Sequence, residues 1–475
     1  MNDLDKSSII SDRATPATPV LLESPDPETS KRLVRKLDFI VLPLLAIIYF
    51  THSLDRANLG NAKTNDFEKD IGLKDNQYSL ILILFYIPYG TLNIPATILA
   101  KRFSPAIVIP CLMFCWGTIA AVTAAVHNFG GILAARICLG VVEAGFFPSA
   151  IFYLTLFYTR TEIAKRISLF YMMGFVANAF SGLIAYSVFQ WHRKLYNWQY
   201  LFIIEGCITL FLAVLSFILL PRSVEKSNYF TPAEKQCSKL RLQAESEMEG
   251  ENFSWSATLK PLIDWHSWMY GFMALCYGCA AASISNFLPT IVKRITVDTV
   301  KANLYTVAPN LSGGVFIVLI CWLSDKTQQR SLCAIGAVAI SMIGFICLGT
   351  VDITHKTGLG YFLTFLLTFG SFTPAVLVPA WLSSNTVSMS GRATTLGLVS
   401  GLQNIAGIIS SKSFRSQDAP IYAPALIISG CFEGAMCIAA AFAYIYYRTI
   451  NRRLDSGKMQ YVRGMEQNPD FRYVL

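Results

Sequence analysis

Long apolar stretches, each of about twenty residues, dominate the pattern of hydrophobic and polar positions between residues 37 and 447. An α-helix needs about 20 consecutive apolar residues to cross the hydrocarbon core of a bilayer. The pattern therefore predicts an all-α membrane protein with twelve transmembrane helices. We place them at about 37–62, 77–100, 105–126, 129–157, 166–190, 198–220, 266–292, 303–323, 331–350, 358–384, 393–413 and 424–447.

Polar segments divide the predicted helices into two groups of six. The two groups are nearly equal in length, and their sixth helices share a Glu-Gly pair at 205–206 and at 433–434. We interpret this as two pseudo-symmetric six-helix domains around a site at the middle of the membrane. The predicted parts are a disordered cytoplasmic tail (1–32), an N-terminal domain (33–220), a cytoplasmic linker (221–264), a C-terminal domain (265–447) and a cytoplasmic tail (448–475).

Composition and charge fit this interpretation. Charged residues make up only 15% of the chain, against about 25% in soluble proteins. The net charge of +9 comes from basic residues scattered over short loops, so it does not predict a nucleic-acid partner. Lys and Arg are roughly twofold more frequent on one face, which predicts cytoplasmic termini and a cytoplasmic linker. We expect the plasma membrane, with the endoplasmic reticulum and the vacuole as alternatives.

Several kinds of chemistry leave no trace in the sequence. Eleven of the twelve Cys lie in apolar segments, so we expect no disulfide framework. No phosphate-binding loop, nucleophile elbow or zinc-protease motif occurs, which argues against ATP-driven transport and against an enzyme. We expect no metal and no cofactor.

Ionised side chains interrupt two of the apolar segments. Asp55 and Arg56 lie in the first predicted helix, and Arg136 and Glu143 lie in the fourth. An Arg or Asp at the centre of a bilayer costs about 2.5–3.5 kcal/mol on insertion scales, so such residues usually face the interior of a bundle and serve a pathway. The sequence therefore predicts that these four residues take part in moving a charged solute.

Each of the four has a matching chemistry. Guanidinium groups bind carboxylate, sulfonate or phosphate oxygens in a bidentate manner, whereas the two carboxyl groups can take up and release protons. Asp55 with Arg136, or Arg56 with Glu143, are both reasonable pairs, and the sequence does not choose between them. The alternative is that these residues form buried ion pairs that only fix helix packing.

Two motifs resemble a known family. Leu-Asp-Arg-x-Asn-x-Gly-Asn-Ala (54–62) and Arg-x-x-x-Gly-x-x-Glu-Ala-Gly-Phe-x-Pro (136–148) are similar to the anion:cation symporter branch of the major facilitator superfamily. The likeness is greater to the fungal allantoate permease family, whose members carry allantoate, nicotinate or pantothenate, and it covers about residues 33–475. The resemblance implies the major facilitator fold and transport by alternating access.

The resemblance also implies roles for single residues. Arg56 and Arg136 would bind the substrate carboxylate, Asp55 and Glu143 would take up protons, and the matching helix 2 Tyr and helix 11 Asn are Tyr89 and Asn404. From its aromatic ring alone we add Trp381 as a substrate contact. The superfamily has a gate motif in an inner loop, Gly-x-Leu-x-Asp-Arg-x-Gly-Arg, that occurs once in each half. The first copy, at 96–102 after helix 2, has lost its acidic residue, whereas the second copy keeps it as Asp325. We assign the gate to Asp325, Arg330 and Arg392.

These observations lead to one hypothesis and several alternatives. We expect a monomeric proton-coupled symporter for a small organic anion, with protons and the lipid bilayer as its other partners. One alternative is a nutrient sensor of the same fold that no longer transports. Others are a sulfonate or dipeptide carrier, and a cation or drug antiporter, which would need acidic cavity groups without paired Arg.

Overall fold

The computed structural model describes residues 26–74, 76–93, 95–96, 102–191, 194–247, 262–296, 298–351, 356–386, 389–461 and 471–475. All regular secondary structure in these ranges is helical. The elements are α1 (Pro27–Lys63), α2 (Phe67–Asp70), α3 (Gln77–Thr91), α5 (Pro105–Thr123), α6 (Phe129–Glu143), α7 (Phe146–Thr155), α8 (Arg160–Val188), α9 (Asn197–Leu219), α10 (Pro232–Glu247), α12 (Trp265–Val292), α13 (Thr299–Tyr305), α14 (Val307–Thr327), α15 (Arg330–Thr350), α16 (Thr357–Ser371), α17 (Pro374–Asn385), α18 (Met389–Ser413), a 3-10 turn (Ser416–Asp418) and α19 (Ala423–Asp455).

Each of the twelve predicted segments overlaps one of these helices or a consecutive pair. Eight described helical stretches are long and apolar enough to cross a membrane: those of α5, α8, α9, α12, α13 with α14, α15, α16 with α17, and α19. The other four predicted segments overlap α1, α3, α6 with α7, and α18. The fourth, eighth and tenth segments are each divided into two helices, which single apolar runs do not reveal.

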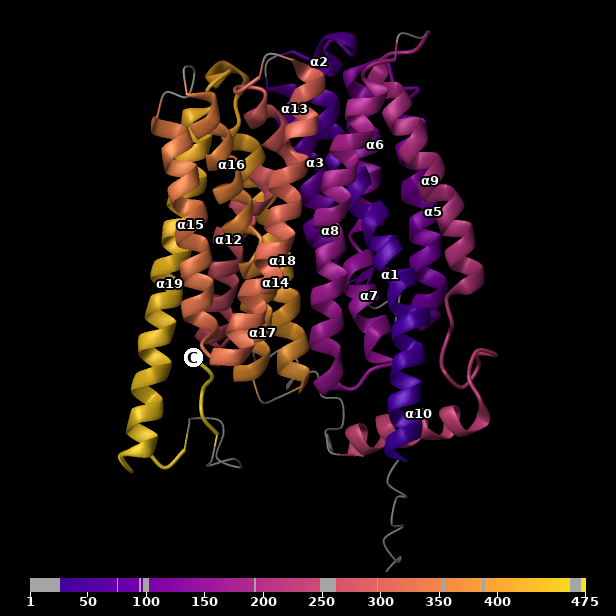
Figure 1. Ribbon diagram of the computed structural model, residues 1–475, viewed down its shortest axis with the longest axis vertical. Helices are drawn as coiled ribbons and strands as arrows, with labels where there is room; N and C mark the ends of the chain where they lie inside the picture. Colours follow the sequence, from indigo (N-terminus) through magenta and orange to yellow (C-terminus); the bar gives the residue numbers. More distant parts are fainter. Residues whose placement is uncertain are drawn as a thin grey trace, which may run out of the picture.

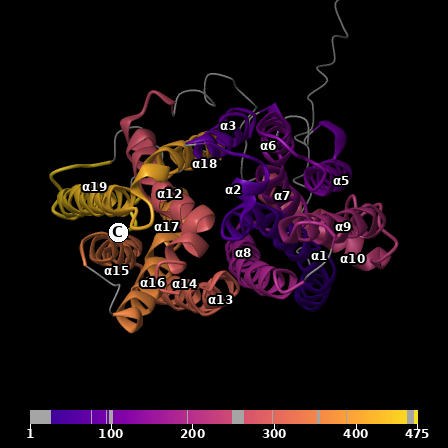
Figure 2. The ribbon, with the colours of Figure 1, turned by 90° about the horizontal axis from the view of Figure 1, so that it is seen from above.

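The helices form two bundles that lie side by side (Figures 1 and 2). Helices α1–α9 make one bundle, the N half, and helices α12–α19 make the other, the C half. Within the N half α1 packs on α8 and α5 on α9; within the C half α12 packs on α18 and α15 on α19. The halves meet along α3 with α18, α8 with α14, and α1 with α12.

The two halves are bonded to each other at the end of the molecule where α1 ends. Lys293 donates to the carbonyl of Thr64 at 2.8 Å, and the Asn303 amide donates to the Thr64 hydroxyl at 2.9 Å. On α1, Gly60 lies against the backbone of α12 so closely that a Cβ would come within 2.7 Å of the Asn286 carbonyl oxygen. These contacts close the interface on this side.

Three boundaries differ from the sequence-based ones. α1 begins at Pro27, because Asp26 caps it by accepting the Thr29 backbone N–H at 3.0 Å, so residues 27–32 are helical and only 1–25 of the predicted tail lie outside the described residues. Helix α10 forms within the predicted linker. Helix α19 continues past residue 447 to Asp455.

Helix α10 is tied to the N half by two ion pairs. Lys36 lies 3.0 Å from Glu234, and Arg241 lies 2.5 Å from Glu162. Burial alone would raise the pKa of Glu234, but hydrogen bonds from Thr231 and from Lys36 outweigh it and hold that pKa below its usual range.

Residues 471–475 return to the C half and bind along its surface. The Asn385 amide donates to the Val474 carbonyl at 3.1 Å and its oxygen accepts the Val474 N–H at 2.8 Å. The Tyr473 ring stacks on Tyr447 with centroids 4.3 Å apart. This short segment contacts both α17 and α19 and so holds these two helices together.

Candidate functional site

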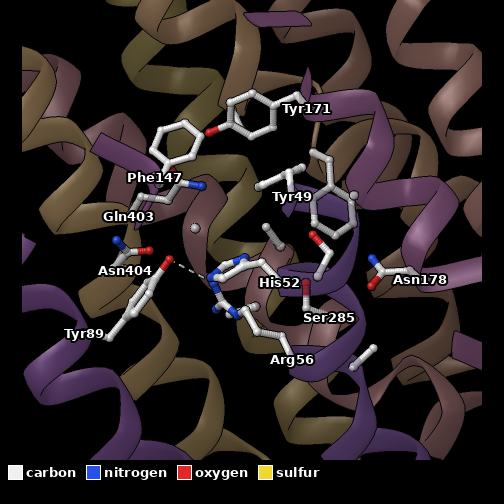
Figure 3. A pocket seen from close by; sticks show the side chains of 18 of the residues that line it. Tyr49, His52, Arg56, Tyr89, Phe147, Tyr171, Asn178, Ser285, Gln403 and Asn404 are labelled. Carbon is white, nitrogen blue, oxygen red and sulfur yellow. Dashed lines mark hydrogen bonds between the residues drawn. The ribbon is translucent and has the colours of Figure 1, made fainter. Parts of the chain in front are cut away.

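A cavity of about 150 Å³ lies between the two halves (Figure 3). Helices α1, α3, α7 and α8 line it from the N half, and helices α12, α17 and α18, with Phe372 just before α17, line it from the C half. Side chains that line this central cavity are Tyr49, His52, Ser53, Arg56, Tyr86, Tyr89, Phe147, Tyr171, Phe175, Asn178, Ser285, Phe372, Ser400, Gln403 and Asn404. It is large enough for several waters or a small organic solute.

Arg56 is the cation of this cavity. Its guanidinium donates to the hydroxyl groups of Tyr89 at 3.2 Å and Tyr86 at 3.4 Å, and its carbon lies 4.8 Å from the centre of the Tyr89 ring. Within the described part of the chain, no carboxylate lies within 4.0 Å of it. An Arg held by neutral hydroxyl groups keeps its full charge available to an anionic ligand.

The rest of the cavity wall is aromatic and neutral. In Figure 3, Asn404 and Gln403 from α18 face the same space as Tyr89 and Arg56. The Asn286 amide on α12 donates to the Tyr86 hydroxyl at 2.9 Å, so Tyr86 links the C half to Arg56. No acidic side chain is found among the described residues that line the cavity. Such a site favours anions over cations.

Three buried carboxylic acids lie inside the N half instead of in the cavity. Asp55 is 2% exposed, Glu143 0% and Glu205 1%, and we call them the acidic cluster. Asp55 accepts a hydrogen bond from the Thr209 hydroxyl at 3.1 Å. Both oxygens of Glu143 and of Glu205 lack a hydrogen bond of ordinary geometry within the described residues. Carboxylates so placed are stable only when protonated or paired.

His52 connects the cavity and the acidic cluster. Its ring lines the cavity, and its Nε2 lies 3.4 Å from Oε2 of Glu143. The contact is long for a hydrogen bond, and neither ring nitrogen has a hydrogen-bond partner within the described part of the chain. Among the described residues that line the cavity, His52 is the one whose side chain lies within ion-pair distance of a carboxylate of the cluster.

Arg136 does not lie where the sequence predicted. It is buried, its guanidinium is 5.9 Å from the Phe202 ring centre, and it is not among the described residues that line the cavity. Neither of the two predicted ion pairs is present among the described residues. The reason is that α6 packs against α3 through Gly140, which directs Arg136 and Glu143 into the N half.

Trp381 is also not a cavity residue. It is 1% exposed, packs among the buried side chains of the C half, and donates its indole N–H to the Val474 carbonyl at 2.8 Å. In this conformation the described cavity wall does not include Trp381, which the sequence analysis named as a substrate contact. Trp381 holds the 471–475 segment against α17, because its one polar atom needs a partner when buried.

The predicted gate is only partly visible. Arg330 lies 3.9 Å from Asp325, whose side chain is largely exposed, so the two form a weak pair within the C half. The Arg330 backbone N–H also binds the carbonyl of Leu475 at 2.6 Å. Arg392 belongs to α18, but its side chain lies outside the described residues.

Sequence reasoning left three residues of this region out of the assigned site. His52 lies three residues before Asp55 and four before Arg56, so helical spacing places all three near one another. Tyr86 lies three residues before Tyr89. Glu205 was noted only as a mark of internal symmetry, although a buried carboxyl in an apolar helix is itself a functional signal.

Comparisons with known proteins agree with this architecture. The model of the Major Facilitator Superfamily matches residues 45–411. The chain is 42% identical over 90% of its length to the MFS-type transporter efuF of Hormonema carpetanum, of which 88% is covered. It is 29% identical over 95% of its length to the high-affinity nicotinic acid transporter of Saccharomyces cerevisiae, of which 86% is covered.

A solved structure gives the same result for the fold. The D-xylose-proton symporter superimposes with a TM-score of 0.63 over 85% of this chain and 96% of its own, at 16% identity. With the family model and the 42% identical relative, the paired bundles and the cavity between them have a common explanation. The chain belongs to the Major Facilitator Superfamily of multi-pass membrane transporters.

Proposed function

We propose that this protein is a proton-coupled symporter for a small organic anion. The observation that carries the proposal is Arg56, a guanidinium in the central cavity with tyrosine hydroxyl groups around it and no described acidic residue on the cavity wall. A cavity built in this way binds a negatively charged group through hydrogen bonds and charge attraction. A cation or drug antiporter would need the opposite arrangement.

The substrate class we propose is a carboxylate attached to a small ring or alkyl body, such as nicotinate, allantoate or pantothenate. The carboxylate would bind Arg56 and the hydroxyl groups of Tyr86 and Tyr89. The body would lie between aromatic walls such as Phe147 and Tyr171, with the Asn404 amide as a further polar contact. The nicotinic acid relative and the motifs of the allantoate permease family both support this choice.

Transport would couple this site to the acidic cluster. Among the described residues, the three carboxyl groups of the cluster and the guanidinium of Arg136 are buried in the N half, so the region can hold protons that water-exposed carboxylates would lose. We propose that Glu143 and Asp55 take up protons from the outside and that Arg136 balances their charge. The two halves would then rock about the anion and open the interface on the opposite side.

The remaining assignments follow from the same picture. We propose a monomer in the plasma membrane with both termini in the cytoplasm. The contacts at the end of α1 would then close the outer side, and this conformation would be the inward-facing one. The proton gradient is the energy source, and we propose no cofactor.

Two measurements test the proposal. Purified protein is first heated with nicotinate, allantoate, pantothenate or a simple sulfonate at two pH values, and a ligand is accepted if it raises the melting temperature. Uptake of that labelled anion into proteoliposomes should then rise when the outside is acidified and stop with a protonophore. Binding without exchange of labelled for unlabelled anion would instead indicate a sensor.

A further inference from the structure

The acidic cluster poses a problem of access. Glu143 has no exposed surface, and neither it nor Asp55 is among the described residues that line the central cavity. A proton-coupled carrier must load and unload such groups in every cycle. Some side chain has to connect them with water, because a carboxyl sealed in an apolar bundle exchanges protons only through a hydrogen-bonding neighbour.

His52 has the position that this connection requires. Its ring forms part of the cavity wall, and its Nε2 is 3.4 Å from Oε2 of Glu143. The ring is fixed by aromatic neighbours, with centroids 4.9 Å from Phe146 on α7 and 5.6 Å from Trp116 on α5. A histidine that only filled space would be expected to bond at least one ring nitrogen. Here both nitrogens lack a hydrogen bond among the described residues.

The other groups around His52 leave Glu143 as its proton partner. The faces that α5 and α7 turn toward it carry Trp116 and Phe146, which do not titrate. The charged or titratable described residues that share the cavity wall with His52 or lie in and beside the acidic cluster are Tyr49, Asp55 and Arg56 on α1, Tyr86 and Tyr89 on α3, Arg136 and Glu143 on α6, Tyr171 on α8 and Glu205 on α9. Within the described residues, only Glu143 lies within 4.0 Å of a ring nitrogen of His52 as an ion-pair partner.

We propose that His52 is a proton gate between the central cavity and Glu143, an inference that rests on the proposed proton coupling. A hydronium ion in the cavity gives a proton to one imidazole nitrogen, and the other nitrogen gives its proton to the Glu143 carboxylate. The products are water, a neutral carboxylic acid and a neutral imidazole. Both ring nitrogens are shielded from solvent here, so this conformation has the gate closed and a rotation of the ring opens it.

A rate measurement without any transported ligand tests the gate. The reconstituted protein receives a rapid pH jump, and the infrared carbonyl band of protonated carboxyl groups is followed in time. The part of the band that Glu143→Gln removes belongs to Glu143. His52→Gln should slow this part at least about tenfold while its final amplitude stays the same. His127→Gln, at an exposed loop position, is the matched control and should not change the rate.

The same experiment has outcomes that would contradict the proposed gate. Equal rates in His52→Gln and in the unchanged protein would overturn the gate. If His52→Gln does not fold, His52→Asn replaces it, and the unchanged protein gives an independent result. Its imidazole ring bands must change no later than the Glu143 band, and a carboxyl that titrates before the imidazole overturns the gate as well.

Failure of the gate can be told apart from failure of the proposed function. Acid-driven anion uptake that is equally fast in His52→Gln, with equal infrared rates, removes the gate and leaves the symporter intact. If the unchanged protein shows no acid-driven uptake, the proposed symport is wrong, whether or not protons reach Glu143 through His52.

Discussion

The two halves each bury a glutamate in their sixth helix, but the side chains around the two glutamates differ. Each sixth helix carries a buried Glu before a Gly, Glu205 in α9 and Glu433 in α19. In the C half, Glu433 accepts a hydrogen bond from the Ser341 hydroxyl at 2.6 Å. In the N half, both oxygens of Glu205 lack a hydrogen bond of ordinary geometry among the described residues, whereas in the C half only Oε1 of Glu433 lacks one.

The surroundings of these two residues differ in the same way. Hydroxyl groups fill the C half, where Ser283 contacts Ser410 at 2.8 Å and Ser429 at 3.0 Å. The N half adds Asp55, Glu143 and His52, which can all change charge. Among the described residues, the N half therefore gathers three buried carboxyl groups and a histidine, whereas the C half has one buried carboxyl in its bundle, Glu433, with hydroxyl groups around it. This difference is the reason why we propose that proton coupling belongs to the N half and that the C half supplies a neutral wall.

The largest expected effect comes from removing one titratable group from the N half. Glu143→Gln should abolish the accumulation of anion driven by a pH gradient, because the amide cannot carry the proton. Exchange of labelled for unlabelled anion should persist, since Arg56 is untouched. Accumulation in proteoliposomes and exchange are measured in parallel.

The matched control is in the C half. Glu433→Gln keeps an acceptor for Ser341, so accumulation should stay within about twofold of the unchanged protein. If Glu433→Gln loses coupling and Glu143→Gln retains it, the comparison between the halves is reversed.

The next effect concerns the cavity itself. Arg56→Gln should weaken anion binding about 10- to 150-fold, because hydrogen bonds to charged groups contribute about 1.5–3 kcal/mol. Tyr89→Phe, which removes one neutral hydroxyl, should cost about tenfold or less. Calorimetric titration of both variants gives the two dissociation constants, and a larger loss for Tyr89→Phe contradicts the role of Arg56.

A smaller effect separates stability from transport in the C half. Asn385→Ala removes the two hydrogen bonds to Val474 and one to Tyr270. Each contributes about 0.5–1.5 kcal/mol, so the melting temperature should fall. The anion dissociation constant should not change, because Asn385 is not among the described cavity residues. A changed dissociation constant with an unchanged melting temperature would show that this segment shapes the site.

The smallest effect is a pH dependence outside the membrane. The pKa of Glu234 is held below its usual range in the folded protein, so its bond with Lys36 stabilises α10 above the ordinary value of 4.5 and is lost as the pH falls through the lowered one. Proteolysis of the 221–264 region should therefore increase below pH 4.5. Glu234→Gln should show no such increase, and an identical increase in that variant would assign it to other groups.

The fold could be predicted from the sequence further than the site. Twenty-residue apolar runs are set by bilayer thickness, and all twelve overlap helices of the structure. The breaks after Glu143 and Tyr305 were not predicted, because they depend on packing between helices and leave the apolar pattern unchanged. The break after Ser371 does have a signal in the sequence, since Pro374 begins α17.

For the site too, the sequence shows which residues are polar and buried but not which surface they face. Arg56, Tyr89 and Asn404 line the cavity, and their roles as substrate contacts stay predictions. Arg136 and Trp381 are not among its described lining residues, because a buried polar atom can face either a cavity or a neighbouring helix, and only the close approach at Gly140 and the course of residues 471–475 decide which. The segment 471–475 gives no apolar signal of its docking.

The most direct test of the central claim counts protons as the anion binds. Calorimetry in buffers of different ionisation enthalpy gives the number of protons taken up per bound anion, for the ligand that stabilises the protein most. The account predicts uptake of about one proton by the unchanged protein and none by the Asp55→Asn, Glu143→Gln double variant, with anion binding retained in both. Anion binding by the unchanged protein with no proton uptake near neutral pH would contradict it.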